Sequence, residues 1–116
     1  MSGIVFFGSE RYESITAFYV DVLDATVWLE QPACTILASD GFRFGFCDRE
    51  AADTAGILTF VTETRAGVDA YYNRLEGRAR GPPSVNEEYD IYQFFATDPE
   101  GRTVEVQTFL HETPPV

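Results

Sequence analysis

The feature that most constrains the fold is an order of elements that the sequence goes through twice: a strand, a helix and then further strands. Hydrophobic periodicity sets this order, because apolar residues recur every second position in strands and about every 3.6 positions in helices. We expect strands at residues 4–7, 25–30, 34–39 and 42–47, then at 56–62, 91–97 and 102–109; helices from Ser9 and over 65–76; and a loop over 81–90.

Each predicted helix carries an apolar stripe at three- and four-residue steps, which is typical of a helix packed on a core. The stripes are Tyr12, Ile15, Phe18, Tyr19, Val22 and Leu23 in the first helix, and Val68, Tyr71, Tyr72 and Leu75 in the second. Ser9 is the expected N-cap of the first helix, with Glu10 and Glu13 in its first turn.

Similar short runs of residues in the two halves support an internal duplication. Ala17-Phe18-Tyr19 before Leu23 corresponds to Ala70-Tyr71-Tyr72 before Leu75, and Ala38-Ser39-Asp40-Gly41 corresponds to Ala96-Thr97-Asp98 with Gly101. A repeat of about fifty residues fits both similarities. The Asp40-Gly41 pair further predicts a two-residue hairpin between its flanking strands.

Composition argues against several classes of partner. The net charge is -11, and the eight basic residues are all Arg. Such a surface repels nucleic acid and anionic lipid. The acidity either steers a cationic ligand or adapts the surface to a salty cytoplasm, and we favour the second. No apolar run reaches the length of about 18 residues that a membrane-spanning helix needs. We see no signal peptide and expect a cytoplasmic location.

The order of elements and two motifs resemble the glyoxalase, bleomycin-resistance and extradiol-dioxygenase superfamily, also called the vicinal oxygen chelate superfamily. The motifs are Ser14-Ile15 with Phe18-Tyr19 and Leu23, and the run from Phe94 to Val106 that contains Asp98-Pro99-Glu100-Gly101-Arg102. The resemblance implies an α+β fold of two βαβββ modules in tandem, whose curled mixed sheets surround a cavity with helices on the outer face. It also implies one domain over 1–116, with halves at about 1–48 and 55–110, and a homodimer.

The resemblance further implies where metal ligands would stand, on the first and last strand of each half. In this chain the places fall at Ile4 or a neighbour, at Gly45, at Gly56 or Ile57, and at Glu105. Glu105 is the one carboxylate among them, and a first-row metal needs three or more protein ligands. His111 lies in the tail, where we expect a solvated side chain. We therefore expect no metal site and no cofactor.

Strand alternation predicts which side chains face the cavity. If Glu105 points inward, so does Gln107, and a turn at residues 99–101 brings Gln93 and Phe95 beside them. In the first half the same alternation turns Arg43 and Gly45 inward, and Phe6 is expected on the same surface. The predicted ligand-binding residues are Phe6, Arg43, Gln93, Phe95, Glu105 and Gln107. Arg43 is alternatively a rim residue paired with an acid, and Glu105 either orients a ligand or is satisfied locally.

Counting outward from the Asp40-Gly41 hairpin places Cys34 opposite Cys47 on the cavity face. We expect two reduced thiols there, because the cytosol is reducing, with a disulfide or a redox role as the alternatives.

These observations favour a metal-independent protein of the bleomycin-resistance type that binds and sequesters a small molecule, aromatic or cationic, between its halves. The first alternative is a metal-dependent enzyme similar to glyoxalase or a dioxygenase, with Glu30 or Asp48 supplying the missing ligands. The second is a domain that acts through protein contacts alone. We expect no catalytic residues in the favoured interpretation.

Overall fold

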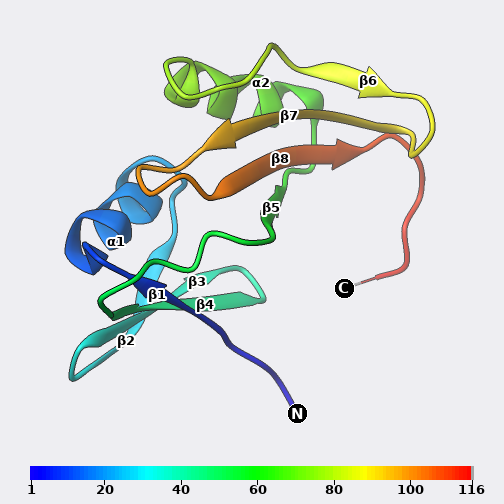
Figure 1. Ribbon diagram of the computed structural model, residues 1–116. Coiled ribbons are helices and arrows are strands. Elements are labelled where there is room, and N and C mark those ends of the chain that lie inside the picture. Colours follow the sequence, from blue (N-terminus) through cyan, green and yellow to red (C-terminus); the bar gives the residue numbers. More distant parts are fainter. Residues whose placement is uncertain (116) are drawn as a thin grey trace. The chain divides into compact units, whose positions relative to one another are not determined.

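The computed structural model describes residues 1–115 (Figure 1). The elements in chain order are β1 (Val5–Ser9), α1 (Tyr12–Asp21), β2 (Thr26–Gln31), β3 (Cys34–Ser39), β4 (Phe42–Asp48), β5 (Ile57–Val61), α2 (Arg65–Leu75), β6 (Ser84–Asn86), β7 (Ile91–Thr97) and β8 (Thr103–Phe109). They form two compact units: Met1–Ala55 with Pro99–Gly101, and residues 56–98 with the described residues from 102 onward.

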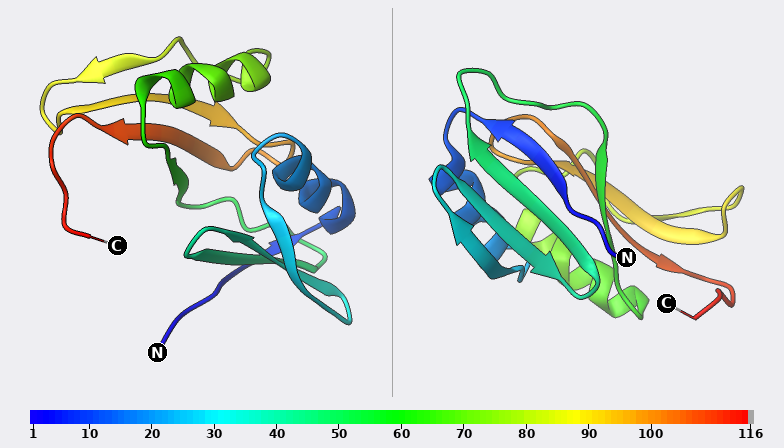
Figure 2. Two further views of the ribbon diagram at one scale, coloured as in Figure 1. Left: turned by 180° about the vertical axis from the view of Figure 1, so that it is seen from behind. Right: turned by 90° about the horizontal axis from the view of Figure 1, so that it is seen from below.

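The first unit is a four-stranded sheet in the order β1-β4-β3-β2, with β1 parallel to β4 and the other neighbours antiparallel. The helix α1 packs on one face of this sheet (Figure 2). Tyr19 of α1 is fully buried and lies 5.4 Å from the ring of Phe44 and 5.2 Å from that of Phe46. These rings form the core of the unit, as the alternation in residues 42–47 predicts.

The second unit repeats this arrangement, with strand order β5-β8-β7-β6 and β5 parallel to β8. Its helix α2 contacts β7 and β8. Val104 and Val106 of β8 are buried on that face with Val68 of α2. Thr64 caps the helix, because its side chain accepts a hydrogen bond from the Gly67 backbone N–H. The predicted α+β fold of two βαβββ modules with mixed sheets is thus confirmed.

Two local predictions are wrong. The first helix begins at Tyr12 rather than at Ser9, and its N-cap is Arg11. Ser9 ends β1, and its buried hydroxyl donates to Oε1 of Glu100 at 2.6 Å. The expected loop over 81–90 contains β6, whose three residues pair with the start of β7. No helix among the described residues is long and apolar enough to cross a membrane.

The turn between β7 and β8 is held by a buried ion pair. Arg102 is 0% exposed and Asp98 is 2% exposed. Asp98 accepts a hydrogen bond from the Arg102 backbone N–H at 2.9 Å, and its second oxygen lies 3.3 Å from Arg102 Nη1. Gly101 adopts a φ of 92°, which a side chain would strain. The motif that carries the family resemblance therefore stabilises the hairpin on which Glu105 lies.

Replacing Arg102 by Met should lower the free energy of unfolding by about 3–5 kcal/mol, because it leaves the buried Asp98 carboxylate without its cation. Urea unfolding followed by circular dichroism measures the change. The control is Arg11→Met, which removes an exposed guanidinium and should change the free energy by less than about 0.5 kcal/mol. Equal losses in the two variants would contradict the structural role of the pair.

The two cysteines are directly opposite each other in β3 and β4, as counted from the hairpin. They form a disulfide, with Cα atoms 4.0 Å apart. The expectation of two reduced thiols is therefore wrong: the pairing register brings the sulfur atoms within bonding reach, whereas the argument for thiols rested on the expected compartment alone.

Reduction should lower the stability of the protein, because the bond closes a loop with a sequence separation of 13 residues. A loop of this size contributes about 3 kcal/mol in the chain-entropy model. The unfolded protein should show no titratable thiol before reduction and two afterwards. The Cys34→Ser/Cys47→Ser variant, which cannot form the bond, should match the stability of the reduced protein and be insensitive to reductant.

Candidate functional site

Glu105 is the charged residue at the centre of the second sheet. In the register of β8 it pairs with Thr59 of β5 on one side and with Phe95 of β7 on the other. All three side chains lie on the face opposite α2, since paired residues point to the same side of a sheet. Glu105 is 8% exposed, and its Oε1 accepts a hydrogen bond from the Thr59 hydroxyl at 2.8 Å.

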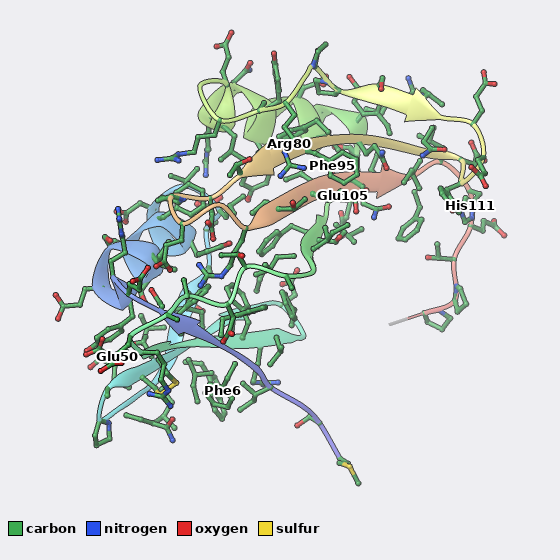
Figure 3. All side chains as sticks on the ribbon, viewed as in Figure 1. Phe6, Glu50, Arg80, Phe95, Glu105 and His111 are labelled. Atoms are coloured by element: carbon green, nitrogen blue, oxygen red, sulfur yellow. A yellow bond between two sulfur atoms is a disulfide. The ribbon has the colours of Figure 1, made fainter. Side chains whose placement is uncertain are left out.

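A pocket of about 510 Å³ lies on this face. Glu105 and Phe95 line it, and His111 stands at its end beyond β8 (Figure 3). The complete lining is Asn86, Tyr89, Ile91, Gln93, Phe95, Glu105, Gln107, Phe109 and His111. Gln107 contributes a buried side-chain oxygen that has no hydrogen-bond partner within the described residues. A buried acceptor of this kind is satisfied by water or by a donor group of a molecule that enters the pocket.

The corresponding face of the first unit is apolar at its centre. Phe6 pairs with Gly45 in the parallel register of β1 and β4, as Thr59 pairs with Glu105. The Phe6 ring covers the glycine so closely that an added Cβ would lie 2.8 Å from its ring carbons. Phe6 also lines a separate hollow of about 590 Å³ with Cys47 and the loop that includes Glu50 (Figure 3).

Arg43 lies on the same face of the first sheet, but it is not paired with a surface acid. Its guanidinium stacks over the Trp28 ring, 5.0 Å from the ring centre. Its Nε is buried and has no hydrogen-bond partner within the described part of the chain. The alternative that Arg43 is a rim residue held by a carboxylate is therefore wrong.

The side chains at the places implied for metal ligands do not suit a divalent metal. Phe6 and Gly45 of the first half offer no donor atom, and the second half offers one carboxylate and one hydroxyl. The residue of β5 that pairs with Glu105 is Thr59, whereas the expected place was Gly56 or Ile57. Within residues 1–115 no group of three or more His, Cys, Asp and Glu side chains is close enough together to hold a metal.

The two carboxylates suggested as substitute ligands point the other way. Glu30 pairs with Thr35, which itself pairs with Phe46 of the helix-covered face. Asp48 follows Cys47 and so alternates to that same face. Neither carboxylate shares a face of the sheet with Phe6 and Gly45.

The structure gathers four of the six predicted ligand-binding residues into the pocket of the second unit: Gln93, Phe95, Glu105 and Gln107. Phe6 and Arg43 lie in the first unit, outside that pocket. The sequence argument missed Thr59, Tyr89, Phe109 and His111. Continuing the alternation of β8 past Gln107 would have given Phe109 and His111, whereas nothing in the sequence gives the register that pairs Thr59 with Glu105.

Comparison with known proteins agrees with this architecture. No family model and no curated protein matches the sequence. A glyoxalase/bleomycin resistance protein/dioxygenase family enzyme from Burkholderia phytofirmans PsJN superposes with a TM-score of 0.81 at 18% identity, over 92% of this chain and 97% of that one. Lactoylglutathione lyase from Agrobacterium tumefaciens gives a TM-score of 0.73 at 20% identity, over 93% and 91%.

A third solved structure, a glyoxalase/bleomycin resistance protein/dioxygenase from Nocardioides, gives a TM-score of 0.75 at 15% identity over 100% of this chain and 87% of that one. Two tandem βαβββ modules thus define the fold. The chain has the fold of the glyoxalase, bleomycin-resistance and dioxygenase proteins, which confirms the resemblance seen in the sequence.

The hydrogen bond from Thr59 should stabilise the Glu105 carboxylate in its nearly buried position. Thr59→Val keeps the shape of the side chain but removes the donor, so the free energy of unfolding should fall by about 1–3 kcal/mol. Thr26→Val is the control, since the exposed Thr26 hydroxyl makes a long bond of 3.4 Å to a backbone oxygen. Chemical unfolding of both variants tests the difference, and an unchanged Thr59→Val protein would refute it.

Proposed function

We propose that this protein binds and sequesters a small molecule without a metal, as proteins of the bleomycin-resistance type do. The observation that carries the proposal is the pocket beside Glu105. It is about 510 Å³ in volume, which lies within the range of small-molecule sites, and it combines aromatic walls with a few polar groups.

The chemistry of the lining favours a ligand that is aromatic and carries a positive charge. Phe95, Tyr89 and Phe109 offer ring surfaces, and Glu105 and Gln107 offer acceptor atoms to a donor. A cation satisfies both acceptors and gains attraction from the net charge of -11. An anion would gain neither.

The proposal extends to the domain organisation, the residues of the first half, the oligomeric state and the location of the protein. We also propose that the two halves form one domain over 1–116, that Phe6 and Arg43 bind ligand on the surface of the first half, and that the protein acts as a homodimer in the cytoplasm. Phe6 is 48% exposed, and Arg43 is partly exposed. Both side chains therefore have surface to offer a ligand or a second subunit.

A metal-dependent enzyme is the second candidate, because one protein of the same fold is named lactoylglutathione lyase. The side chains at the positions implied for metal ligands argue against such an enzyme. Thr59 and Glu105 are the pair with oxygen atoms there, and they supply one hydroxyl and one carboxylate. Metal analysis of desalted protein decides: Ni, Zn, Fe or Mn at one equivalent per chain would overturn the proposal. A domain acting through protein contacts alone would show no ligand binding at all.

Removing the charge of Glu105 should weaken the binding of aromatic amines. A thermal-shift panel of phenethylamine, phenylacetamide and phenylacetate should show the largest stabilisation with the amine. Glu105→Gln should reduce the affinity for the amine at least about tenfold by calorimetry, because a charge-assisted hydrogen bond is worth roughly 1.5–3 kcal/mol.

The matched control is Glu63→Gln, which removes an exposed carboxylate of the same unit outside the pocket. Its affinity for the amine should equal that of the parent protein. Equal weakening in both variants would reduce the effect to general electrostatics, and the absence of any shift across the panel would remove the support for ligand binding.

A further inference from the structure

Arg80 stands in line with Glu105 on the pocket face of the second sheet. Ala79 forms an isolated antiparallel bridge with Ala96, and the Arg80 backbone N–H donates to the Phe95 carbonyl at 2.9 Å. This pairing sets Arg80 opposite Phe95, which is itself opposite Glu105. Opposed residues point to the same side of a sheet, so Arg80, Phe95 and Glu105 share one face (Figure 3).

The guanidinium of Arg80 is held in a fixed position on that face. Its Nη2 donates to Oγ1 of Thr103 at 2.7 Å, and its Nε donates to Oγ1 of Thr97 at 3.3 Å. Thr97 and Thr103 are a cross-strand pair, one step along the face from Phe95 and Glu105. Two hydroxyls thus orient the cation beside the pocket.

These two hydrogen bonds leave other N–H groups of the Arg80 guanidinium available to donate. A guanidinium carries five N–H groups in a planar fork that suits a carboxylate. Among residues 1–115 no carboxylate lies within ion-pair distance of Arg80. Arg80 is exposed, so its remaining donors are open to an anionic group of a ligand.

We propose that the ligand of this site is an aromatic zwitterion, whose ammonium group binds Glu105 and Gln107 and whose carboxylate binds Arg80. This inference rests on the proposed function and names the class of ligand. The aromatic ring of the ligand packs on Phe95, which lies between the two charged residues in the same row.

The two groups proposed to bind the charges of the ligand lie one cross-strand pair apart on this face. Thr103, which holds the guanidinium, is two residues from Glu105 along β8, a distance of roughly 6.6–6.8 Å. An extended dipeptide bridges a similar distance between its ammonium and carboxylate groups, since a chain spans at most about 3.6 Å per residue. We take the dipeptide as the ligand length to test, with a single α-amino acid as the shorter alternative.

The test uses Phe-Gly and Gly-Phe as free dipeptides, each also with an acetylated N-terminus or an amidated C-terminus, and phenylalanine as the short control. Calorimetry on the full chain should give the tightest binding with a free dipeptide. Amidation should weaken binding about tenfold in the parent protein. Amidation should have no effect on binding to Arg80→Met, because that variant has lost the guanidinium that binds the carboxylate.

Glu105→Gln provides the reciprocal comparison. Acetylation, which removes the ammonium group of the dipeptide, should weaken binding to the parent protein and to Arg80→Met. It should not weaken binding to Glu105→Gln. Arg80 is exposed, so Arg80→Met should fold normally, and its circular dichroism spectrum and melting curve verify this. Arg80→Lys keeps the charge but not the fork, and should recover part of the preference for the free carboxylate.

The possible failures are distinct. If amidated dipeptides bind as well as free ones while acetylated ones bind weakly, the zwitterion is wrong and the proposed capture of an aromatic cation stands. If phenylalanine binds as tightly as the dipeptides, the inferred length is wrong. If neither a dipeptide nor an aromatic amine binds, both proposals fall together.

Discussion

The parallel pairing of β5 with β8 is the contact on which the site depends. It sets Thr59 beside Glu105 on one face and leaves Val104 and Val106 on the other, buried under α2. Because side chains alternate along a strand, a slip of β5 by one residue would move the buried Leu58 and Phe60 off the face that α2 covers and turn Thr59 toward the helix. The cost of that exchange fixes the register, and the register places the one carboxylate of the pocket next to its hydrogen-bond donor.

The first unit has the same pairing with different chemistry. Where the second unit sets Thr59 beside Glu105, the first sets Phe6 beside Gly45. The ring and the glycine depend on each other, since any Cβ at position 45 would meet the ring carbons of Phe6. A duplicated backbone therefore supports one polar and one apolar surface.

Local pattern predicted the antiparallel part of the site. Counting from the turn at residues 99–101 paired Gln93 with Gln107 and Phe95 with Glu105, because a hairpin transmits its register from the turn outward. The same count failed for Thr59, because a crossover helix separates β5 from β8 and no turn links their registers. It also failed for Arg80, since the bridge from Ala79 to Ala96 joins a segment without a strand pattern to the edge of β7.

The sequence by itself determined the order of the elements, the faces that α1 and α2 cover, and the position of Cys34 opposite Cys47. Each of these follows from periodicity or from a turn between neighbouring strands. The tertiary structure decided that the cysteines are bonded, that β6 completes the second sheet, and that Thr59, Glu105 and Arg80 share a surface. The shared surface joins residues far apart in the chain, and their partners are selected only when the packing of the whole sheet fixes which strands lie side by side.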